Sequence, residues 1–194
     1  PLAERMRPRS ITEVFGQGHI LGKGCLLPNL ICENRVSNLI FAGPPGSGKT
    51  TLASVIAAEG KCKILKVNAV TSNAAELRDT LKLVRYYGSA NCFLFVDELH
   101  RFNKAQQDLL LPDVESGDVR LIGATTHNPR YYIIDPLLSR CQLLSLEPIP
   151  SPIIDTALQS ALQDDDRGLG SRGCHAGNEI IKQIALLAEG DLRK

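Results

Sequence analysis

The chain has 194 residues, with 22 Lys and Arg against 21 Asp and Glu, so that its formal net charge is +1, and 43% of its residues are hydrophobic. This composition is typical of a folded domain and excludes an intrinsically disordered chain. A net charge so close to zero excludes a strongly basic arm as the main tether to nucleic acid, although it allows a local basic face.

The sequence predicts neither a membrane protein nor a secreted one, since no apolar run approaches the length of a membrane span and no basic, then apolar, leader opens the chain. The cysteines lack the paired spacing of a disulfide framework or a zinc site, which predicts reduced thiols in a cytosolic protein. They are Cys25, Cys32, Cys62, Cys92, Cys141 and Cys174. Because the chain begins with Pro1 and not with Met, we expect it to be a piece of a longer protein.

Five short apolar runs predict β-strands. Near-continuous apolar runs of this length are typical of strands that are buried on both faces of a parallel sheet. Helical patterns alternate with the runs, which predicts a doubly wound α/β fold with helices on both faces of the sheet. The predicted strands are Asn38–Ala42, Lys63–Val67, Cys92–Val96, Val119–Ala124 and Gln142–Leu146.

Residues that favour a helix start precede three of the helical patterns. Two pairs have the spacing of a capping box, and a third combines an N-cap residue with a proline in the first turn. The pairs are Asn73 with Glu76, Asn103 with Gln106, and Asp135 with Pro136. Within the stretch Lys104–Glu115, Pro112 predicts a kink.

The composition changes after Leu146, where three prolines follow in close succession. We predict a helix from Ser151 to Gln163, a polar, glycine-rich loop over residues 164–177, and a second helix that ends with Gly190 at its C′ position. The apolar face of this second helix is formed by Ile180, Ile181, Ile184 and Leu187. Asp191 is suited to cap a further helix. The predicted organisation is therefore an α/β domain over residues 1–148 and a small, truncated helical domain over residues 149–194.

The segment Gly43–Thr50 fits the phosphate-binding pattern G-x-x-x-x-G-K-[ST], known as Walker A, and lies between a predicted strand and a predicted helix. Its glycines let backbone N–H groups surround phosphates at the positive end of the helix. Lys49 is predicted to reach the β- and γ-phosphates, and Thr50 to bind Mg²⁺. The residues predicted to bind ATP here are Gly43, Pro44, Pro45, Gly46, Ser47, Gly48, Lys49, Thr50 and Thr51.

The run Cys92–Val96 ends in Asp97 and Glu98, which matches a Walker B motif. Strand ends of open α/β sheets face the ligand crevice, so both carboxylates are predicted to face the phosphates. Asp97 would hold Mg²⁺ through water, and Glu98 would orient and deprotonate the attacking water. Together with Lys49, these acids predict nucleotide hydrolysis.

Two further positions have two interpretations each. Thr125 and Thr126 follow another predicted strand, where a hydroxyl could bind the γ-phosphate or the attacking water, or could simply cap the strand. Arg140 lies at a predicted helix end, where an arginine is commonly a partner of the helix dipole.

Together these residues resemble the AAA+ ATPases of the clamp-loader-like branch, and most closely the replication-associated recombination protein A family. The resemblance extends from Leu2 to Arg193, and its most discriminating part is the long segment around Asp97 and Glu98. The segments that carry it are Arg7-Pro8, Phe15-Gly16-Gln17, Gly43–Thr50, Val96–Gly117, Leu121–Pro129 and Leu137–Cys141.

The resemblance implies a P-loop NTPase fold with ATP and Mg²⁺ as cofactors, and roles for individual residues. Thr126 would be the sensor-1 residue. Arg140 would be the arginine finger, acting on ATP bound by a neighbouring subunit, and Arg193 would be the sensor-2 arginine of the lid. The pocket for the nucleotide base would be formed by Arg7, Pro8, Phe15, Gly16 and Gln17.

The resemblance also implies partners and a location. Members of the family form oligomers, and a ring-like tetramer is expected for the full-length protein. They bind forked DNA, single-stranded DNA and DNA ends, and act with replication or repair proteins at stalled forks. The expected location is the cytoplasm, at the nucleoid in a bacterium, or the nucleus in a eukaryote. The piece by itself is expected to bind nucleotide weakly and to have little ATPase activity, which DNA would stimulate in the whole protein.

Alternatives stay open. The chain could be a clamp-loader or branch-migration ATPase subunit, or a nucleotide-gated interaction module with incidental hydrolysis. Arg101 and Lys104 could touch DNA or form a solvated helix face. His127 stands where the family commonly has an acid and receives no role, since a lone histidine is more often structural. The apolar stretch around Tyr131 and Tyr132 either packs on the sheet or meets a neighbouring protomer.

Overall fold

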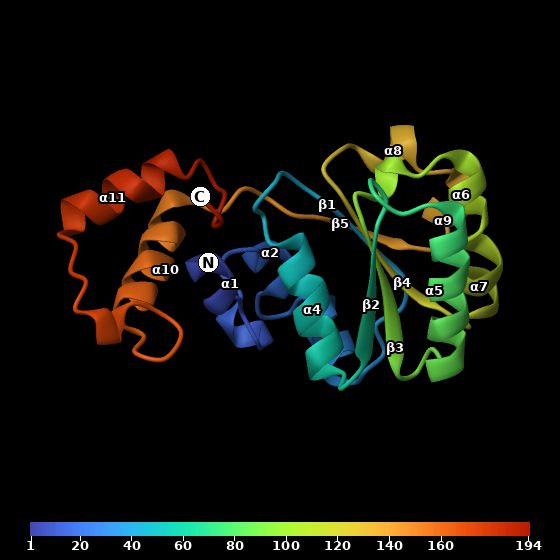
Figure 1. The fold of residues 1–194 in the computed structure, drawn as a ribbon, viewed down its shortest axis with the longest axis horizontal. Helices are drawn as coiled ribbons and strands as arrows, with labels where there is room; N and C mark the ends of the chain where they lie inside the picture. The colour runs from blue at the N-terminus through green and yellow to red at the C-terminus, as the bar shows by residue number, and fades with distance from the viewer.

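A five-stranded sheet forms the centre of the computed structural model, which describes residues 1–194 (Figure 1). All neighbouring strands are parallel, and their order across the sheet is β2-β3-β4-β1-β5. The sheet confirms the predicted parallel α/β architecture. The strands are β1 (Leu39–Ala42), β2 (Lys63–Asn68), β3 (Cys92–Asp97), β4 (Arg120–Thr125) and β5 (Gln142–Ser145), each within one or two residues of the predicted run.

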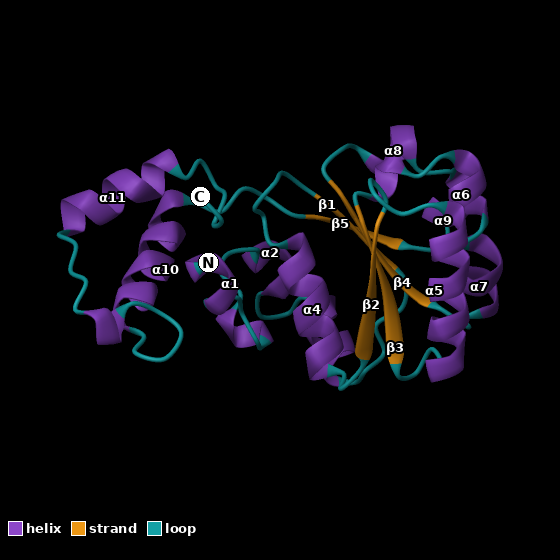
Figure 2. Ribbon diagram, in the orientation of Figure 1, coloured by secondary structure: helices purple, strands orange, loops and turns teal.

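The sheet separates two hydrophobic cores, because successive side chains of a strand point to opposite faces. In β3, Leu94 belongs to the core that is covered by α5 (Ala74–Tyr87), α7 (Leu111–Ser116) and α9 (Asp135–Leu138). Its neighbours Phe93 and Phe95 belong to the opposite core, under α3 (Leu26–Cys32) and α4 (Lys49–Glu59). Figure 2 shows the sheet between α4 and α5. This arrangement explains why the runs that became central strands are apolar at nearly every position.

The shorter elements connect these layers. Before β1 lie α1 (Leu2–Arg5), η1 (Ile11–Glu13) and α2 (Gly18–Leu21), and after β3 come η2 (Leu99–Arg101) and α6 (Lys104–Asp108), while α8 (Pro129–Tyr132) follows β4. None of the helices combines the length and the apolar character that a membrane crossing requires.

Both predicted capping boxes are present, at the start of α5 and of α6. The stretch after Asn103 is more strongly interrupted than a kink, because α6 ends at Asp108 and α7 begins afresh at Leu111 with Pro112 in its first turn. A proline lacks the N–H that a continuing helix needs and restricts the residue before it, which favours a new helix start there. The prediction for Asp135 was wrong by one residue: Ile134 occupies the N-cap position, and Asp135 is the first helical residue of α9.

The C-terminal body consists of α10 (Ser151–Gln163), η3 (Gly170–Arg172) and α11 (Asn178–Leu187), and it has a small core of its own that includes Ile154 and Ala185. Both helices lie away from the sheet, with α10 between α1 and α11 (Figure 1). The start and end of α10 agree with the prediction, whereas the predicted loop over 164–177 contains η3. The division of the chain at residue 148 stays a prediction.

The predicted apolar face of α11 was wrong. Only Ile181 of the four residues is buried, whereas Ile180, Ile184 and Leu187 are 54%, 44% and 76% exposed. The physical reason is that α11 packs mainly against α10, so that one narrow side of the helix is covered. The helix end also differs, because Glu189 takes the first left-handed position (φ 50°) and Gly190 follows it.

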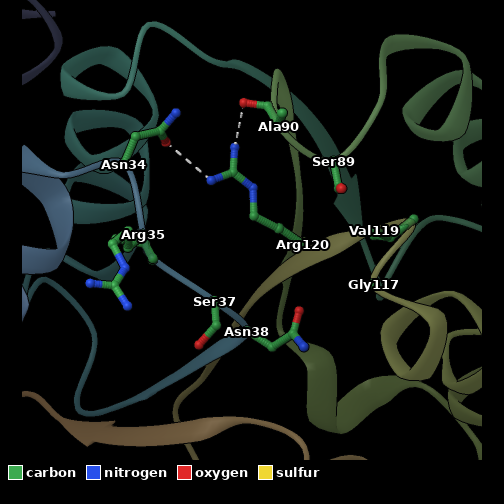
Figure 3. Close-up of a pocket in the computed structure, with 10 residues that line it drawn as sticks. Asn34, Arg35, Ser37, Asn38, Ser89, Ala90, Gly117, Val119 and Arg120 are labelled. Atoms are coloured by element: carbon green, nitrogen blue, oxygen red, sulfur yellow. Dashed lines mark hydrogen bonds between the residues drawn. The ribbon is translucent and has the colours of Figure 1, made fainter.

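At the edge of the sheet where the strands begin, Arg120 of β4 links three separate segments beside a pocket (Figure 3). Its guanidinium donates to Asn34 Oδ1 (3.1 Å) and to the carbonyl oxygen of Ala90 (2.9 Å), and lies 3.1 Å from the sulfur of Cys62. The guanidinium also stacks 4.0 Å from the centre of the Phe93 ring. These contacts assign Arg120 a structural role at the edge of the sheet opposite to the carboxyl ends of the strands.

Candidate functional site

The glycine-rich segment after β1 forms a loop that leads directly into α4. Gly46 and Gly48 have positive φ angles of 74° and 96°, which turn the loop sharply and which only glycine adopts without strain. The Ser47 hydroxyl donates to the carbonyl oxygen of Pro44 (2.8 Å) and closes the turn. The loop therefore presents backbone N–H groups at the N-terminus of an eleven-residue helix, the arrangement that favours phosphate binding.

Lys49 is the first residue of α4, and its side chain turns back along the loop. Its ammonium donates to the carbonyl oxygens of Gly43 and Pro44, both at 2.7 Å. Burial lowers the pKa of Lys49, while the nearby carboxylates of Glu98 and Asp97 oppose that shift. An ammonium has three N–H groups, so the two bonds fix its position and leave one donor for a ligand.

Asp97 ends β3, and Glu98 follows it in a left-handed conformation (φ 53°). The Glu98 backbone N–H donates to Asp97 Oδ1 (3.1 Å). Burial and the charge of Glu98 raise the pKa of Asp97. Both carboxylates line the same cleft as Lys49 and Thr50. The predicted convergence of the two strand ends is therefore present in the structure.

Thr126 follows β4, the strand between β1 and β3. Its hydroxyl donates to Glu98 Oε2 at 3.2 Å. The ends of three adjacent strands thus bring together a glycine-rich loop, a lysine, two carboxylates and a hydroxyl.

These groups lie in a cleft of about 870 Å³ between the sheet body and the C-terminal helices. The N-terminal segment contributes Arg7, Pro8 and Phe15, as predicted for a base pocket, and Arg193 reaches the cleft from the C-terminal end. The cleft is also lined by apolar side chains of α10 and α11 and by residues of α1 and just after it. Nothing in the sequence indicated that these residues would lie in the cleft. They include Leu2, Met6, Ile154, Leu158 and Ile184.

Two residues predicted for the base pocket lie outside the cleft lining. Gly16 packs against Ile149, and the buried side chain of Gln17 bridges two segments. Gln17 Nε2 donates to the carbonyl oxygens of Ser47 (3.2 Å) and Glu147 (2.8 Å), and its Oε1 accepts from the Glu147 N–H (3.0 Å). Gln17 therefore ties the glycine-rich loop to the segment that leads to α10.

Asp191 lies directly against the glycine-rich loop, since a Cβ added at Gly46 would clash with its carboxylate. Arg193 donates to both carboxylate oxygens of Asp191, at 3.0 and 2.8 Å, which lowers the pKa of Asp191 and raises that of Arg193. The end of the chain thus contacts the loop through Asp191, a residue for which the sequence predicted only a helix cap.

Residues 39–147, more than half of the chain, match the family model described as "ATPase family associated with various cellular activities (AAA)". The chain belongs to the AAA family of ATPases. The match agrees with the five-stranded sheet and with the loop that ends at Lys49, and it identifies the fold as that of a P-loop NTPase.

Named relatives align with this AAA ATPase over its whole length. "Replication-associated recombination protein A" of Haemophilus influenzae is 40% identical over 195 residues, and that of Escherichia coli K12 is 41% identical over 196 residues. "ATPase WRNIP1" of Dictyostelium discoideum is 36% identical and is covered to 22%. The chain spans 44% of the length of the two bacterial relatives. The resemblance found in the sequence is thereby confirmed.

Solved structures agree with the fold. The RuvB Holliday junction branch migration motor of Thermotoga maritima matches with a TM-score of 0.76 at 27% identity, over 97% of this chain and 62% of RuvB. A variant of the same RuvB matches with a TM-score of 0.78 at 26% identity.

Arg140 of the AAA ATPase does not line the cleft. Its guanidinium pairs with Glu115 of α7 (2.6 Å) and donates to the carbonyl oxygen of Pro136 (2.7 Å) and to Ser139 Oγ (2.9 Å). Its backbone lies two residues before β5, where its carbonyl oxygen accepts from the side chain of Asn38. Within one chain, Arg140 therefore contacts α7 and α9 and none of the cleft residues.

The residues whose roles the sequence left open follow the carboxyl ends of β3 and β4. Arg101 and Lys104 are exposed and do not line the cleft. Part of the apolar stretch packs on the sheet, because Ile133 is buried in the core there, whereas Tyr131 is 83% exposed and its contact with a neighbouring protomer stays a prediction. The ring of Tyr132 lies 5.0 Å from that of His127.

Proposed function

We propose that this AAA ATPase binds ATP with Mg²⁺ in the cleft and hydrolyses the γ-phosphate. The observation that carries the proposal is the convergence of the glycine-rich loop, Asp97, Glu98 and Thr126 on one cleft. A nucleotide-gated interaction module that lacks catalytic power would need the loop alone. The Glu98 carboxylate beside the loop supports hydrolysis.

The residues of the cleft fit this cofactor. The backbone N–H groups of Gly46 and of residues 48–51, together with the free donor of Lys49, suit the β- and γ-phosphates. The hydroxyl of Thr50 and the carboxylate of Asp97 offer hard oxygen ligands, the kind that Mg²⁺ prefers. When bound, Mg²⁺ neutralises charge on the phosphate oxygens. The neighbourhood of Arg7, Pro8 and Phe15 would receive the base.

Glu98 is the proposed general base, which accepts a proton from the attacking water. Thr126 is the proposed sensor 1 and holds the Glu98 carboxylate through its hydroxyl. Arg193 is the proposed sensor 2, held beside the glycine-rich loop by Asp191. Residues 149–194 would then act as a lid over the domain of residues 1–148.

Arg140 is the proposed arginine finger for a neighbouring subunit, because within its own chain it lies outside the cleft. A ring-like oligomer, a tetramer in the full-length protein, would bring Arg140 to a second site. Since such a finger contributes about 10³–10⁵ in rate, this chain by itself is expected to turn ATP over slowly.

DNA is the proposed substrate of the motor, in forked, single-stranded or end form, with replication or repair proteins as partners. The names of the bacterial relatives support this proposal, as does the similarity to RuvB, a Holliday junction branch migration motor. Arg101 and Lys104, both exposed, offer cations for phosphate contacts. The proposed location is the cytoplasm, at the nucleoid of a bacterium, or the nucleus of a eukaryote.

The test is ATP turnover by the full-length protein with and without forked DNA. We expect DNA to stimulate turnover and Lys49→Ala to abolish nucleotide binding and turnover together. Turnover that is unchanged in Lys49→Ala would refute the assigned site. Wild-type partner binding by Lys49→Ala would favour the interaction module, and movement of four-way junctions would favour the branch-migration alternative.

A further inference from the structure

Two histidine rings stack beside Glu98, and the proposed function leaves both without a role. His100 lies in η2, directly after β3, and His127 follows β4. Their ring centres are 4.2 Å apart with planes inclined by 42°, and Tyr132 packs edge-on against both. The side chain of His100 is 4% exposed. His100 contacts the Glu98 carboxylate directly, whereas His127 is exposed to solvent.

The hydrogen bonds around Thr126 determine which nitrogen of His127 carries a proton. A carboxylate accepts bonds and donates none, so the single proton of the Thr126 hydroxyl is directed to Glu98 Oε2 (3.2 Å). Thr126 Oγ1 also lies 3.2 Å from His127 Nδ1 and can only accept there. His127 Nδ1 must therefore be the donor.

The same reasoning applies to His100. The Thr125 hydroxyl donates to the carbonyl oxygen of His127 (3.2 Å) and accepts from the His127 backbone N–H (3.1 Å). Its remaining contact, with His100 Nδ1 at 3.0 Å, must therefore also be accepted. His100 Nδ1 also lies 3.3 Å from Glu98 Oε2. Burial and the neighbouring His127 lower the pKa of His100, which agrees with a neutral ring.

We propose that His127 is a positioning residue for the Glu98 carboxylate. Its Nδ1–H donates to Thr126 Oγ1 and so orients the Thr126 hydroxyl toward Glu98 Oε2, the oxygen that His100 Nδ1 also approaches. The other oxygen, Oε1, accepts no hydrogen bond from the protein. Oε1 is therefore the atom that accepts the proton of the attacking water. This inference rests on the proposed function, because it specifies how Glu98 acts as the base.

Two variants of the full-length protein separate the hydrogen bond from the packing. His127→Phe keeps a ring against Tyr132 and His100 but loses the donor, whereas His127→Asn places an amide N–H near the position of Nδ1. We expect His127→Phe to lower kcat by about tenfold, the effect of one lost hydrogen bond, with ATP affinity and KM within about twofold of the wild type. His127→Asn should restore most of that loss.

Equal kcat in His127→Phe and the wild type would overturn the inference, as would His127→Asn being as slow as His127→Phe. A wild-type protein that turns over no ATP would instead refute the proposed function, so the two failures are distinguishable.

The protonation of the rings can be measured without turnover. Nitrogen NMR of ¹⁵N-histidine-labelled full-length protein should show the proton of His127 on Nδ1. A neutral His127 with its proton on Nε2 would overturn the inference whether or not the protein hydrolyses ATP.

Discussion

Gln17 offers the sharpest test of how the cleft is held together. Its side chain makes three hydrogen bonds, one to Ser47 of the glycine-rich loop and two to the backbone of Glu147. The residue is only 6% exposed. Gln17→Met keeps nearly the same length and volume, so the substitution removes the hydrogen bonds with little change in packing.

The magnitude follows from the number of bonds. A protein hydrogen bond contributes about 1 kcal/mol net, and a buried group left without a partner costs at least as much. Gln17→Met should therefore lower the free energy of unfolding by about 3 kcal/mol. That is a large part of the total stability of an ordinary domain, which is about 5–15 kcal/mol.

The assay is urea unfolding at 25 °C with a matched control. Gln159→Met makes the same substitution on the surface of α10, where Gln159 Nε2 donates only to Asp155 at 2.7 Å. Such a helical pair contributes about 0.2–0.5 kcal/mol. A change at Gln17 no larger than that at Gln159 would refute the reasoning that these three bonds link the loop to the segment that leads to α10.

Three further outcomes are expected. Glu98→Gln should lower ATP turnover by about 10²–10⁴-fold while ATP still binds, as filter binding would show, and unchanged turnover would exclude Glu98 as the base. Leu94→Ala should lower the free energy of unfolding, measured in urea, by about 2–5 kcal/mol, because the Leu94 side chain is fully buried in β3. As the control, Leu83 is 52% exposed, so Leu83→Ala should lower it by less than about 1 kcal/mol. Hydrogen bonds from the Arg167 side chain and from the Arg9 backbone N–H lower the pKa of Glu13. The ion pair of Glu13 with Arg167 therefore stabilises the fold fully at pH values above the unfolded pKa of about 4.3. This stabilisation is lost as the pH falls through the folded pKa. Arg167→Ala should raise the pKa of Glu13 in an NMR titration, and an unmoved titration would show that the ion pair does not form in solution.

The elements that were predicted correctly depend on residues close together in the chain. The capping box of Asn73 and Glu76 needs only one helical turn, and its bonds are present at 2.9–3.2 Å. The run Cys92–Val96 is apolar at every position, which identifies a strand covered on both faces. Lys49 and Glu98 could be placed at one site because the carboxyl ends of parallel strands share one edge of a sheet.

The prediction for α11 failed because it depended on how much of this helix is buried by a neighbouring segment. The period of Ile180, Ile181, Ile184 and Leu187 is helical, but periodicity does not show how much of a face a neighbouring helix buries, and α10 covers little of it. The placement of Gly16 and Gln17 at the base pocket stays a prediction from the resemblance, and the contacts of the Gln17 side chain with Ser47 and Glu147 could not be read from the sequence.

Hydrophobic periodicity and turn chemistry act over a few residues, and they were enough to place the strands and helices along the chain, the phosphate loop and the acids at the end of β3. The contact of Asp191 with the phosphate loop, the pairing of Arg140 with Glu115, and the stacking of His100 on His127 beside Glu98 became known from the folded structure alone. Those contacts join segments that lie far apart in the chain, and their geometry depends on how whole layers pack.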